Sequence, residues 1–383
     1  MKKRLRVLAA SLIVIAGLCL VLTVYSIGIS DKDVAERDFI SYWAAGQLLL
    51  HGQNPYDFQA VKKLELAAGR DPAEPLLMMR NPPVAFFLVL PFGLAGPKAT
   101  LIAWLAVLMG VLSLAILLIW RLNGRPDSRF HLLGYLFAPA LACLMAGQFG
   151  IVMLLGVVLF LYLHRNQPLA AGAALPLCSL KPHYFLPFAV ALLLWLVTTK
   201  SYRILAGFCA AMTAICALAY AVDHHGWGQY SQMMQAGGAL NEVIPELSAQ
   251  LRLLIDPRAV WIQFVPEAAA CIWAVWYLWS RRSNWSWMEH GLVLLLVGAL
   301  CTPFGWFFDE SVLLPAILTA MYRAIESRRA IWPLVVIAGA ALVELQMNVQ
   351  IISRHYLWTT PAWLCWYLYA TGKFSRQTAA ASV

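Results

Sequence analysis

Charged side chains are scarce in this chain. Asp, Glu, Lys and Arg make up 12% of its 383 residues, whereas soluble domains carry about 25%. Hydrophobic residues make up 61% of the sequence and are gathered in long runs. This composition excludes an ordinary soluble domain. It predicts an all-α polytopic membrane protein that forms one domain over residues 1–383.

The sequence also lacks the motifs of the common soluble enzymes. It has no P-loop, no dinucleotide-binding glycine fingerprint, no Gly-x-Ser-x-Gly and no HExxH. Its eight cysteines lie inside or at the ends of apolar runs, in neither a disulfide framework nor zinc-ligand spacing. Any group transfer would therefore need a donor that carries its own energy to the membrane, such as a sugar linked to a lipid phosphate.

The formal net charge of +9 comes from small groups of Lys and Arg between apolar runs. This spacing is typical of signals that keep loops in the cytoplasm. It does not form a basic face for a phosphate backbone, so we expect no nucleic-acid partner. About twelve runs (11–13) are expected to span the membrane: 7–27, 98–120, 130–146, 150–163, 168–180, 184–198, 203–222, 259–279, 287–302, 306–323, 331–348 and 355–371.

A cytoplasmic N-terminus puts the Arg/Lys-rich loops on the inside. The run 7–27 is too long for a signal peptide and is expected to be an uncleaved first span. Alternation from there places these loops in the cytoplasm: 121–129, 164–167, 199–203, 280–286 and 324–330. One further apolar segment lies at 82–96. If it crossed the membrane fully, every later loop would change sides and the Arg/Lys-rich loops would lie outside. We therefore expect a short membrane-edge or re-entrant helix that begins at the Pro-Pro pair; the alternative is a thirteenth span.

Two long loops are expected on the outer face, at 28–97 and 223–258. The first contains two segments with helical spacing of apolar residues, Phe39–Leu50 and Asp57–Ala68, which are expected to lie as amphipathic helices on the membrane surface. The second contains a polar helix around 245–254.

Polar side chains at the membrane boundary gather on this outer side. Such residues are costly at membrane depth and indicate function. A carboxylate suits a general base, and cations suit an anionic group such as a lipid phosphate. The set comprises Asp38, Tyr42, Asp57, Arg80, Gln148, Lys181, His183, Asp309, Glu310, Gln346, Asn348, Arg354 and His355.

Several of these residues could instead serve the structure alone. Asp38 could form a surface ion pair with Arg37, and Asp57 could cap the N-terminus of a helix. Gln148 stands at a tight hairpin, where its amide could serve the backbone. Three further groups also have structural alternatives. Lys181 could reach the lipid headgroups, and Asp309 and Glu310 could lie in a solvated loop. Arg354 and His355 could anchor the chain at the membrane interface.

The outer-loop motifs resemble a known family. Asp38-Phe39-x-x-Tyr42-x-Ala44-Ala45, followed by Gly52-x-Asn54-Pro55-Tyr56-Asp57, resembles the first-loop signature of glycosyltransferase family 87. Asn81-Pro82-Pro83, Gly147-Gln148 and Lys181-Pro182 continue the resemblance, which covers roughly residues 37–185. The C-terminal half agrees only in hydropathy. Trp43 and Arg80 depart from the pattern, since tyrosines are expected there.

The resemblance implies a GT-C fold and an inverting sugar transfer. The donor would be a polyprenyl-phosphate-linked sugar, typically mannose, and the acceptor an outer-leaflet lipid or glycan. Asp38 would be the general base that deprotonates the acceptor hydroxyl. We expect Lys181, then Arg80, Arg354 and His355, to hold the donor phosphate. Tyr42, Gln148 and His183 are expected to contact substrate, with neither a metal nor another cofactor.

Functions from different classes remain open at this point. A secondary transporter or a flippase would also explain the many spans, although no inverted repeat is visible and the polar groups lie at one face rather than at the midplane. A scaffold without catalysis and an oligosaccharide ligase are also candidates. The short loops favour a bacterial inner membrane with the site facing the periplasm.

Overall fold

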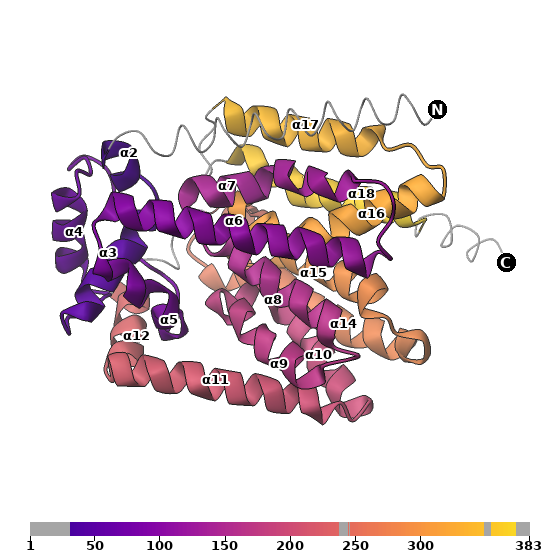
Figure 1. The fold of residues 1–383 in the computed structure, drawn as a ribbon, viewed down its shortest axis with the longest axis horizontal. Helices are drawn as coiled ribbons and strands as arrows, with labels where there is room; N and C mark the ends of the chain where they lie inside the picture. The colour runs from indigo at the N-terminus through magenta and orange to yellow at the C-terminus, as the bar shows by residue number, and fades with distance from the viewer. Residues whose placement is uncertain (1–30, 237–243, 245, 348–353, 373–383) are drawn as a thin grey trace.

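The structure, a computed structural model, describes residues 31–236, 244, 246–347 and 354–372 (Figure 1). These residues form helices joined by turns, and no β-strand occurs among them. The all-α expectation is therefore confirmed for this part of the chain. The expected span 7–27, Asn348 and the side chain of Arg354 lie outside the described part.

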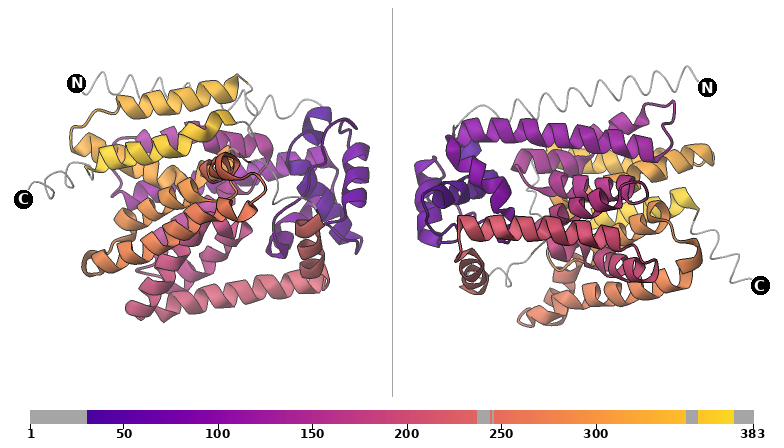
Figure 2. Two further views of the ribbon diagram at one scale, coloured as in Figure 1. Left: turned by 180° about the vertical axis from the view of Figure 1, so that it is seen from behind. Right: turned by 60° about the horizontal axis from the view of Figure 1, so that its bottom comes forward.

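The first loop forms a compact group of short helices at one end of the molecule (Figures 1 and 2). Pro82–Pro83 opens a helical stretch, and Pro91 changes it from α-helix to 3₁₀-helix because proline lacks the amide proton that the α pattern needs. The elements are α2 (Asp31–Ala35), α3 (Phe39–Leu50), α4 (Phe58–Ala67), η1 (Pro83–Ala85), α5 (Phe86–Val89) and η2 (Leu90–Leu94).

Apolar helices follow, and several begin with a 3₁₀ turn. The first group comprises α6 (Pro97–Leu122), η3 (Phe130–Leu136), α7 (Ala138–Ala146), α8 (Gly150–Leu163), α9 (Pro168–Ala174), η4 (Leu175–Leu180), η5 (Pro182–Phe185), α10 (Leu186–Thr198) and α11 (Tyr202–Val222). The second outer loop then carries α12 (Gly226–Ala236) and α13 (Leu247–Ile255).

The C-terminal part has the same character. It comprises η7 (Val260–Phe264), α14 (Val265–Arg281), η8 (Arg282–Asn284), the π-helix η9 (Trp287–Gly291), α15 (Leu292–Cys301), η10 (Phe307–Leu313), α16 (Leu314–Glu326), α17 (Trp332–Gln346), η11 (Arg354–Trp358) and α18 (Thr359–Thr371). Eleven of the twelve expected spans fall wholly or almost wholly within the described residues, and helices occupy each of them.

Length and hydropathy alone identify two of the described helices as able to cross a membrane. They are α6 and α11, whereas the shorter apolar helices have 10–17 residues. α6, α11 and α17 run along the long axis of the molecule (Figure 1). The helix positions therefore agree with the predicted spans, while the number of crossings stays a prediction.

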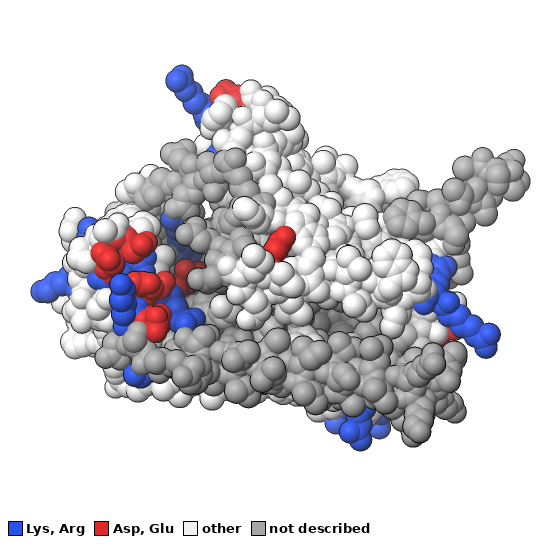
Figure 3. Space-filling view, turned by 90° about the horizontal axis from the view of Figure 1, so that it is seen from above, with Lys and Arg blue, Asp and Glu red and all other residues white. Residues whose placement is uncertain are grey.

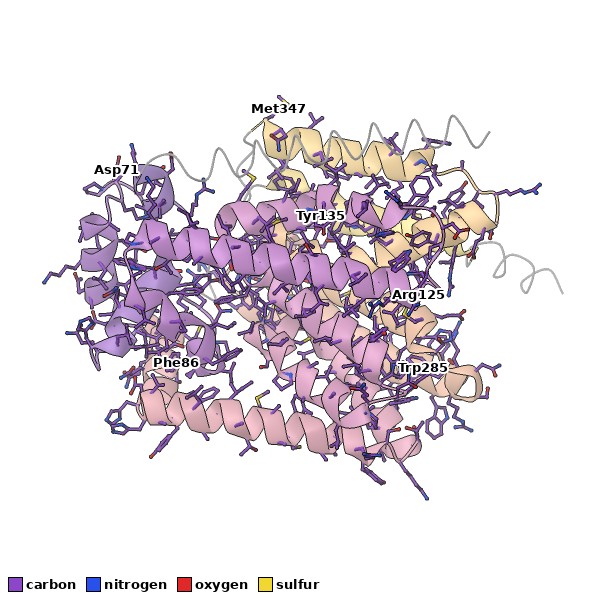
Figure 4. All side chains as sticks on the ribbon, viewed as in Figure 1. Asp71, Phe86, Arg125, Tyr135, Trp285 and Met347 are labelled. Atoms are coloured by element: carbon purple, nitrogen blue, oxygen red, sulfur yellow. The ribbon has the colours of Figure 1, made fainter. Side chains whose placement is uncertain are left out.

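The two ends of the long axis differ in charge. Acidic and basic atoms mix at the end that carries the first loop, whereas the opposite end is mainly basic (Figure 3). Asp71 and Phe86 mark the first end, and Arg125 and Trp285 mark the second (Figure 4). The loop at 121–129 and the loop at 280–286, both expected inside, thus lie at the same end of the molecule and away from the first loop.

Helix α3 is not the surface helix that its sequence predicts. Ten of its twelve residues are buried, including Ser41 and Tyr42. Its polar side chains bond inside the protein: the indole of Trp43 donates to the Ala95 carbonyl at 2.9 Å, and the amide of Gln47 donates to the Gly93 carbonyl at 2.8 Å. Internal partners, rather than water, satisfy the polar side of α3.

Helix α4 is amphipathic, as its sequence predicts, while its place on the membrane surface stays a prediction. Asp57 caps it, because the carboxylate accepts a hydrogen bond from the Ala60 amide at 2.8 Å, as expected for an acid at an N-cap. Val61 and Glu65 face the interior while most of the remaining side chains are wholly or partly exposed.

Candidate active site at the start of helix α3

Asp38 immediately precedes α3, yet its side chain makes no capping bond to the helix. Its backbone is already helical, with φ −54° and ψ −30°, whereas capping residues are usually extended. The carboxylate instead accepts a hydrogen bond from the Gln148 side-chain amide at 2.7 Å through Oδ2. Oδ1 has no hydrogen-bond partner within the described residues. One oxygen of Asp38 is thus held and the other is open.

The amide of Gln148 links Asp38 to Tyr42. Its oxygen accepts a hydrogen bond from the Tyr42 hydroxyl while its nitrogen donates to Asp38. The ring of Tyr42 packs against the ring of Phe149 at a tilt of 30°, with centroids 4.3 Å apart. The interpretation in which Gln148 merely serves the hairpin backbone is therefore wrong: the side chain connects two candidate site residues that lie more than 100 positions away.

The hairpin that presents Gln148 is fixed against α3. Gly147 has φ +71°, and a Cβ there would lie 2.7 Å from the Cβ of Phe39. Only glycine fits this left-handed and crowded position without strain. The indole of Trp104 donates to the Gly147 carbonyl at 2.8 Å, and the backbone amide of Gln148 donates to the Cys143 carbonyl at 3.0 Å.

Lys181 lies near Asp38 but is already paired. Its ammonium group is 2.8 Å from both carboxylate oxygens of Asp309. It also lies 4.9 Å and 4.8 Å from the ring centroids of Trp306 and Phe308, where cation–π attraction adds to the ion pair. Asp309 is 0% exposed. The solvated-loop interpretation of Asp309 and Glu310 is wrong, since both acids are buried.

A second buried ion pair, between Arg70 and Glu65, holds the segment that precedes α3. Arg70 lies 3.6 Å from Glu65 and donates to the Ala35 carbonyl at 3.1 Å and the Pro75 carbonyl at 2.8 Å. It thereby ties the end of α4 to the turn before Asp38. Burial raises the pKa of Glu65 to about 7, with Arg70 opposing this rise.

The environment of Asp38 suits a base. Burial raises the pKa of its carboxyl group above the usual range, while the hydrogen bond from Gln148 and the charge of Lys181 oppose the rise. The Arg37 guanidinium points elsewhere and donates to the Met145 carbonyl. No ion pair joins Arg37 to Asp38 in the described part of the chain, so that interpretation is wrong.

Arg80 and His355, two of the other predicted cations, lie on segments that contact the surroundings of Lys181 and Asp309. Asn81 donates to the Leu180 carbonyl at 2.8 Å, which places Arg80 next to the Lys181 segment. Arg80 is half-buried. His355 is exposed, and the adjacent Tyr356 stacks on Phe307 with centroids 4.0 Å apart. This links the start of η11 to the segment that carries Asp309.

His183 is not a cation here. Burial and the neighbouring Lys181 lower the pKa of its imidazole to about 4, so the ring is neutral at physiological pH. Within the described residues, no group of three or more His, Cys, Asp or Glu side chains could hold a metal ion.

Sequence reasoning missed the Arg70–Glu65 pair, and it named Asp309 without its pairing to Lys181. The signal for Asp309 was an acidic pair inside the apolar stretch Trp306–Leu314. Arg70 gave no such signal, because it stands in a polar loop.

A model of glycosyltransferase family 87 matches residues 80–303, more than half of the chain. The chain belongs to this family. It is therefore a membrane glycosyltransferase, with a sugar donor and an acceptor as its substrates. The family membership favours group transfer over a transporter, a flippase or a scaffold.

The matched region differs from the region of resemblance in the sequence. It includes Asn81, Gln148 and Lys181, extends well past residue 185, and begins after the motif that contains Asp38. The role of Asp38 therefore rests on its geometry. No curated protein and no solved structure matches the chain.

Proposed function

We propose that the protein transfers a sugar, with mannose as first choice, from a polyprenyl-phosphate donor to a lipid or glycan acceptor at the outer face of the membrane. The transfer inverts the anomeric centre. Asp38 is the general base.

The open oxygen of Asp38 carries this proposal. Gln148 holds Oδ2, and Oδ1 has no partner in the described residues, so the carboxylate has a fixed direction and a free acceptor site. A raised pKa makes it a stronger base than an ordinary Asp. The second oxygen can therefore take the proton of an acceptor hydroxyl.

The reaction needs one proton transfer. The acceptor oxygen forms a bond to the anomeric carbon as its proton passes to Asp38, and the bond from that carbon to the phosphate oxygen breaks. Polyprenyl phosphate leaves as an anion, so no strong general acid is required. The direction of attack opposite to the leaving phosphate gives inversion.

The donor phosphate lies, in this proposal, beside Lys181 and Arg80. The carboxylate of Asp309 shares the charge of Lys181, so Lys181 orients a phosphate more than it neutralises one. Arg80 on the adjacent segment supplies the remaining charge, and Arg354 and His355 are further candidates. Tyr42 and Gln148 act on the substrate through Asp38.

The reaction is tested with purified protein in nanodiscs. Radiolabelled polyprenyl-phosphate mannose and a bacterial membrane-lipid extract are supplied, and the product linkage is read by NMR. Label in a new lipid or glycan with inverted configuration is expected. Retained configuration would contradict the base role. Absence of transfer from mannosyl, glucosyl and galactosyl donors would contradict the donor class.

We also propose a bacterial inner membrane with the Asp38 end facing the periplasm. The mainly basic end of the molecule, which carries Arg125, supports this orientation (Figures 3 and 4). Single cysteines placed at Asp71 and at Arg125 in a cysteine-free chain test it. A membrane-impermeant thiol reagent added to whole spheroplasts should label the first and spare the second; the reverse result would overturn the orientation.

A further inference from the structure

Three polar side chains near Lys181 have hydrogen-bonding atoms without partners. The Tyr184 hydroxyl and the Nε2 atom of His183 are buried and make no hydrogen bond within the described residues. The carboxyl group of Glu246 likewise makes none there. Tyr184 is 1% exposed and Glu246 is 6% exposed. Buried polar atoms are usually satisfied, so the two unsatisfied atoms of His183 and Tyr184, beside the carboxyl group of Glu246, indicate a place for a ligand.

These groups converge on the segment between α15 and η10. A Cβ at Gly305 would lie 2.6 Å from Oε1 of Glu246, so Glu246 rests directly on that backbone. The ring of His183 meets Phe304 edge to face, with centroids 5.9 Å apart. The Tyr184 hydroxyl is close enough to Glu246 and Asp309 to be affected by both of their charges.

The cluster adjoins the proposed active site on its C-terminal side. His183 and Tyr184 follow Lys181 in the chain after Pro182, and Lys181 is bound to Asp309. Asp309 also lies close enough to Asp38 to influence its pKa. A ligand held by the cluster would therefore lie close to the Lys181–Asp309 pair.

The chemistry of the cluster is that of neutral hydrogen bonding. Burial and the nearby acids Glu310 and Asp309 raise the pKa of Glu246 well above its usual range, which favours the protonated carboxyl group, and a protonated carboxyl group offers both a donor and an acceptor. His183 is neutral, and a tyrosine hydroxyl also both donates and accepts. Such groups pair well with hydroxyls and poorly with a phosphate.

We propose that Tyr184, Glu246 and His183 form a subsite for the hydroxyl groups of a sugar ring. This inference rests on the proposed function, and it adds the part of the site that recognises the sugar. The ring belongs to the donor or to a glycan acceptor, and the two sources share the same hydroxyl chemistry. Neither Tyr184 nor Glu246 was among the residues predicted from sequence.

The test compares two lipids that differ only in the sugar. Affinities for polyprenyl-phosphate mannose and for bare polyprenyl phosphate are measured in nanodiscs with wild type, Tyr184→Phe and Glu246→Ala. A lost neutral hydrogen bond in a desolvated site weakens binding by roughly tenfold. We expect that loss for the sugar-bearing lipid in each variant, with the affinity for bare polyprenyl phosphate unchanged.

A second arm separates donor from acceptor. If both lipids bind as in wild type but the KM for the acceptor rises roughly tenfold, the subsite holds the acceptor ring, and the inference stands. Equal weakening for both lipids would show a structural effect and overturn it. Unchanged donor affinity together with unchanged acceptor KM would also overturn it.

Matched controls come from the opposite end of the molecule. Tyr367→Phe removes a hydroxyl that donates to the Glu289 carbonyl at 3.1 Å, and Glu289→Gln removes a partner of Arg323. Both should leave the two lipid affinities unchanged. The role of Asp38 as the base is tested separately. Wild-type turnover by Asp38→Asn would contradict that role and would leave the comparison of the two lipids unaffected.

Discussion

Asp38 and Glu310 are acids in apolar surroundings, and they differ in how many hydrogen bonds their oxygens accept. Glu310, in η10, accepts from Thr359 at 2.5 Å, from Thr360 at 2.7 Å and from the Trp363 indole at 2.8 Å. Both of its oxygens are occupied, and all three donors come from α18. Asp38 accepts one side-chain bond, from Gln148, on one oxygen.

This difference separates a structural carboxylate from a chemical one. A carboxylate with hydrogen bonds on both oxygens is held by its donors and serves to join two helices. A carboxylate held by one oxygen is oriented but still able to accept. The Lys181–Asp309 pair lies between these cases, since each group satisfies the other while both remain close to Asp38.

Asp38→Asn should give the largest effect. The amide keeps the shape of the side chain but cannot take a proton, so turnover should fall by roughly 10²–10⁴-fold. The thermal midpoint should change little, because few contacts are lost. Steady-state transfer rates and a thermal melt on one preparation measure both quantities. A fall in midpoint that matches the loss of rate would mean that Asp38 is structural.

Glu310→Ala should show the opposite pattern. The Thr360 hydroxyl and the Trp363 indole lose their acceptor, at a cost of about 1–3 kcal/mol each, whereas the Thr359 hydroxyl keeps the Tyr356 carbonyl at 2.6 Å. The thermal midpoint should fall by about 5–10 °C, whereas the folded fraction should keep much of its turnover. Rates normalised to folded protein by size-exclusion chromatography measure this. A normalised rate as low as that of Asp38→Asn would break the distinction between the two acids.

Lys181 can be tested together with its partner. Lys181→Met leaves Asp309 buried without its cation, so both stability and donor affinity should fall, the affinity by roughly tenfold. The double variant Lys181→Met with Asp309→Asn removes the unpaired charge. It should regain the thermal midpoint but not the affinity for polyprenyl-phosphate mannose. Recovery of both would show that Lys181 serves the fold alone.

Gln148→Ala should shift the pH dependence of transfer. The amide proton of Gln148 stabilises the ionised form of Asp38 and lowers its pKa, so its removal raises that pKa further. Because the base must be ionised, the acid limb of kcat/KM should move to higher pH, by about one unit.

Gln47→Ala is the matched control. Gln47 lies on α3, and its side-chain amide donates to the Gly93 carbonyl in η2 rather than to Asp38. It should leave the pH profile in place. An identical shift in both variants would contradict the role of Gln148.

The sequence predicts the helices better than their environments. Apolar runs such as 98–120 and 203–222 locate α6 and α11 within two residues at each end, because hydrophobic length alone defines them. Helix α3 was predicted at its true bounds but on the membrane surface. The partners of Tyr42 and Gln47, which are Gln148 and the Gly93 carbonyl, lie in segments that sequence spacing does not connect to α3.

The site was predicted in part for the same reason. Asp38 stood out as an acid beside an apolar segment. Its contact with Gln148 and the Lys181–Asp309 pair join residues 110 and 128 positions apart, and no local pattern reveals which distant residues meet. The pairing of Asp309 with Lys181 and the place of Glu246 follow only from the folded arrangement.

Single-turnover transfer by Asp38→Asn beside Asp57→Asn is the most direct test of the central claim. Both variants change an acid of the first loop to its amide, but Asp57 caps α4, a task that asparagine also performs. Donor is bound first, and acceptor is then added. We predict wild-type donor affinity for both proteins, wild-type transfer for Asp57→Asn, and transfer slowed by at least roughly 100-fold for Asp38→Asn. Transfer by Asp38→Asn at the rate of Asp57→Asn would contradict the assignment of Asp38 as the base.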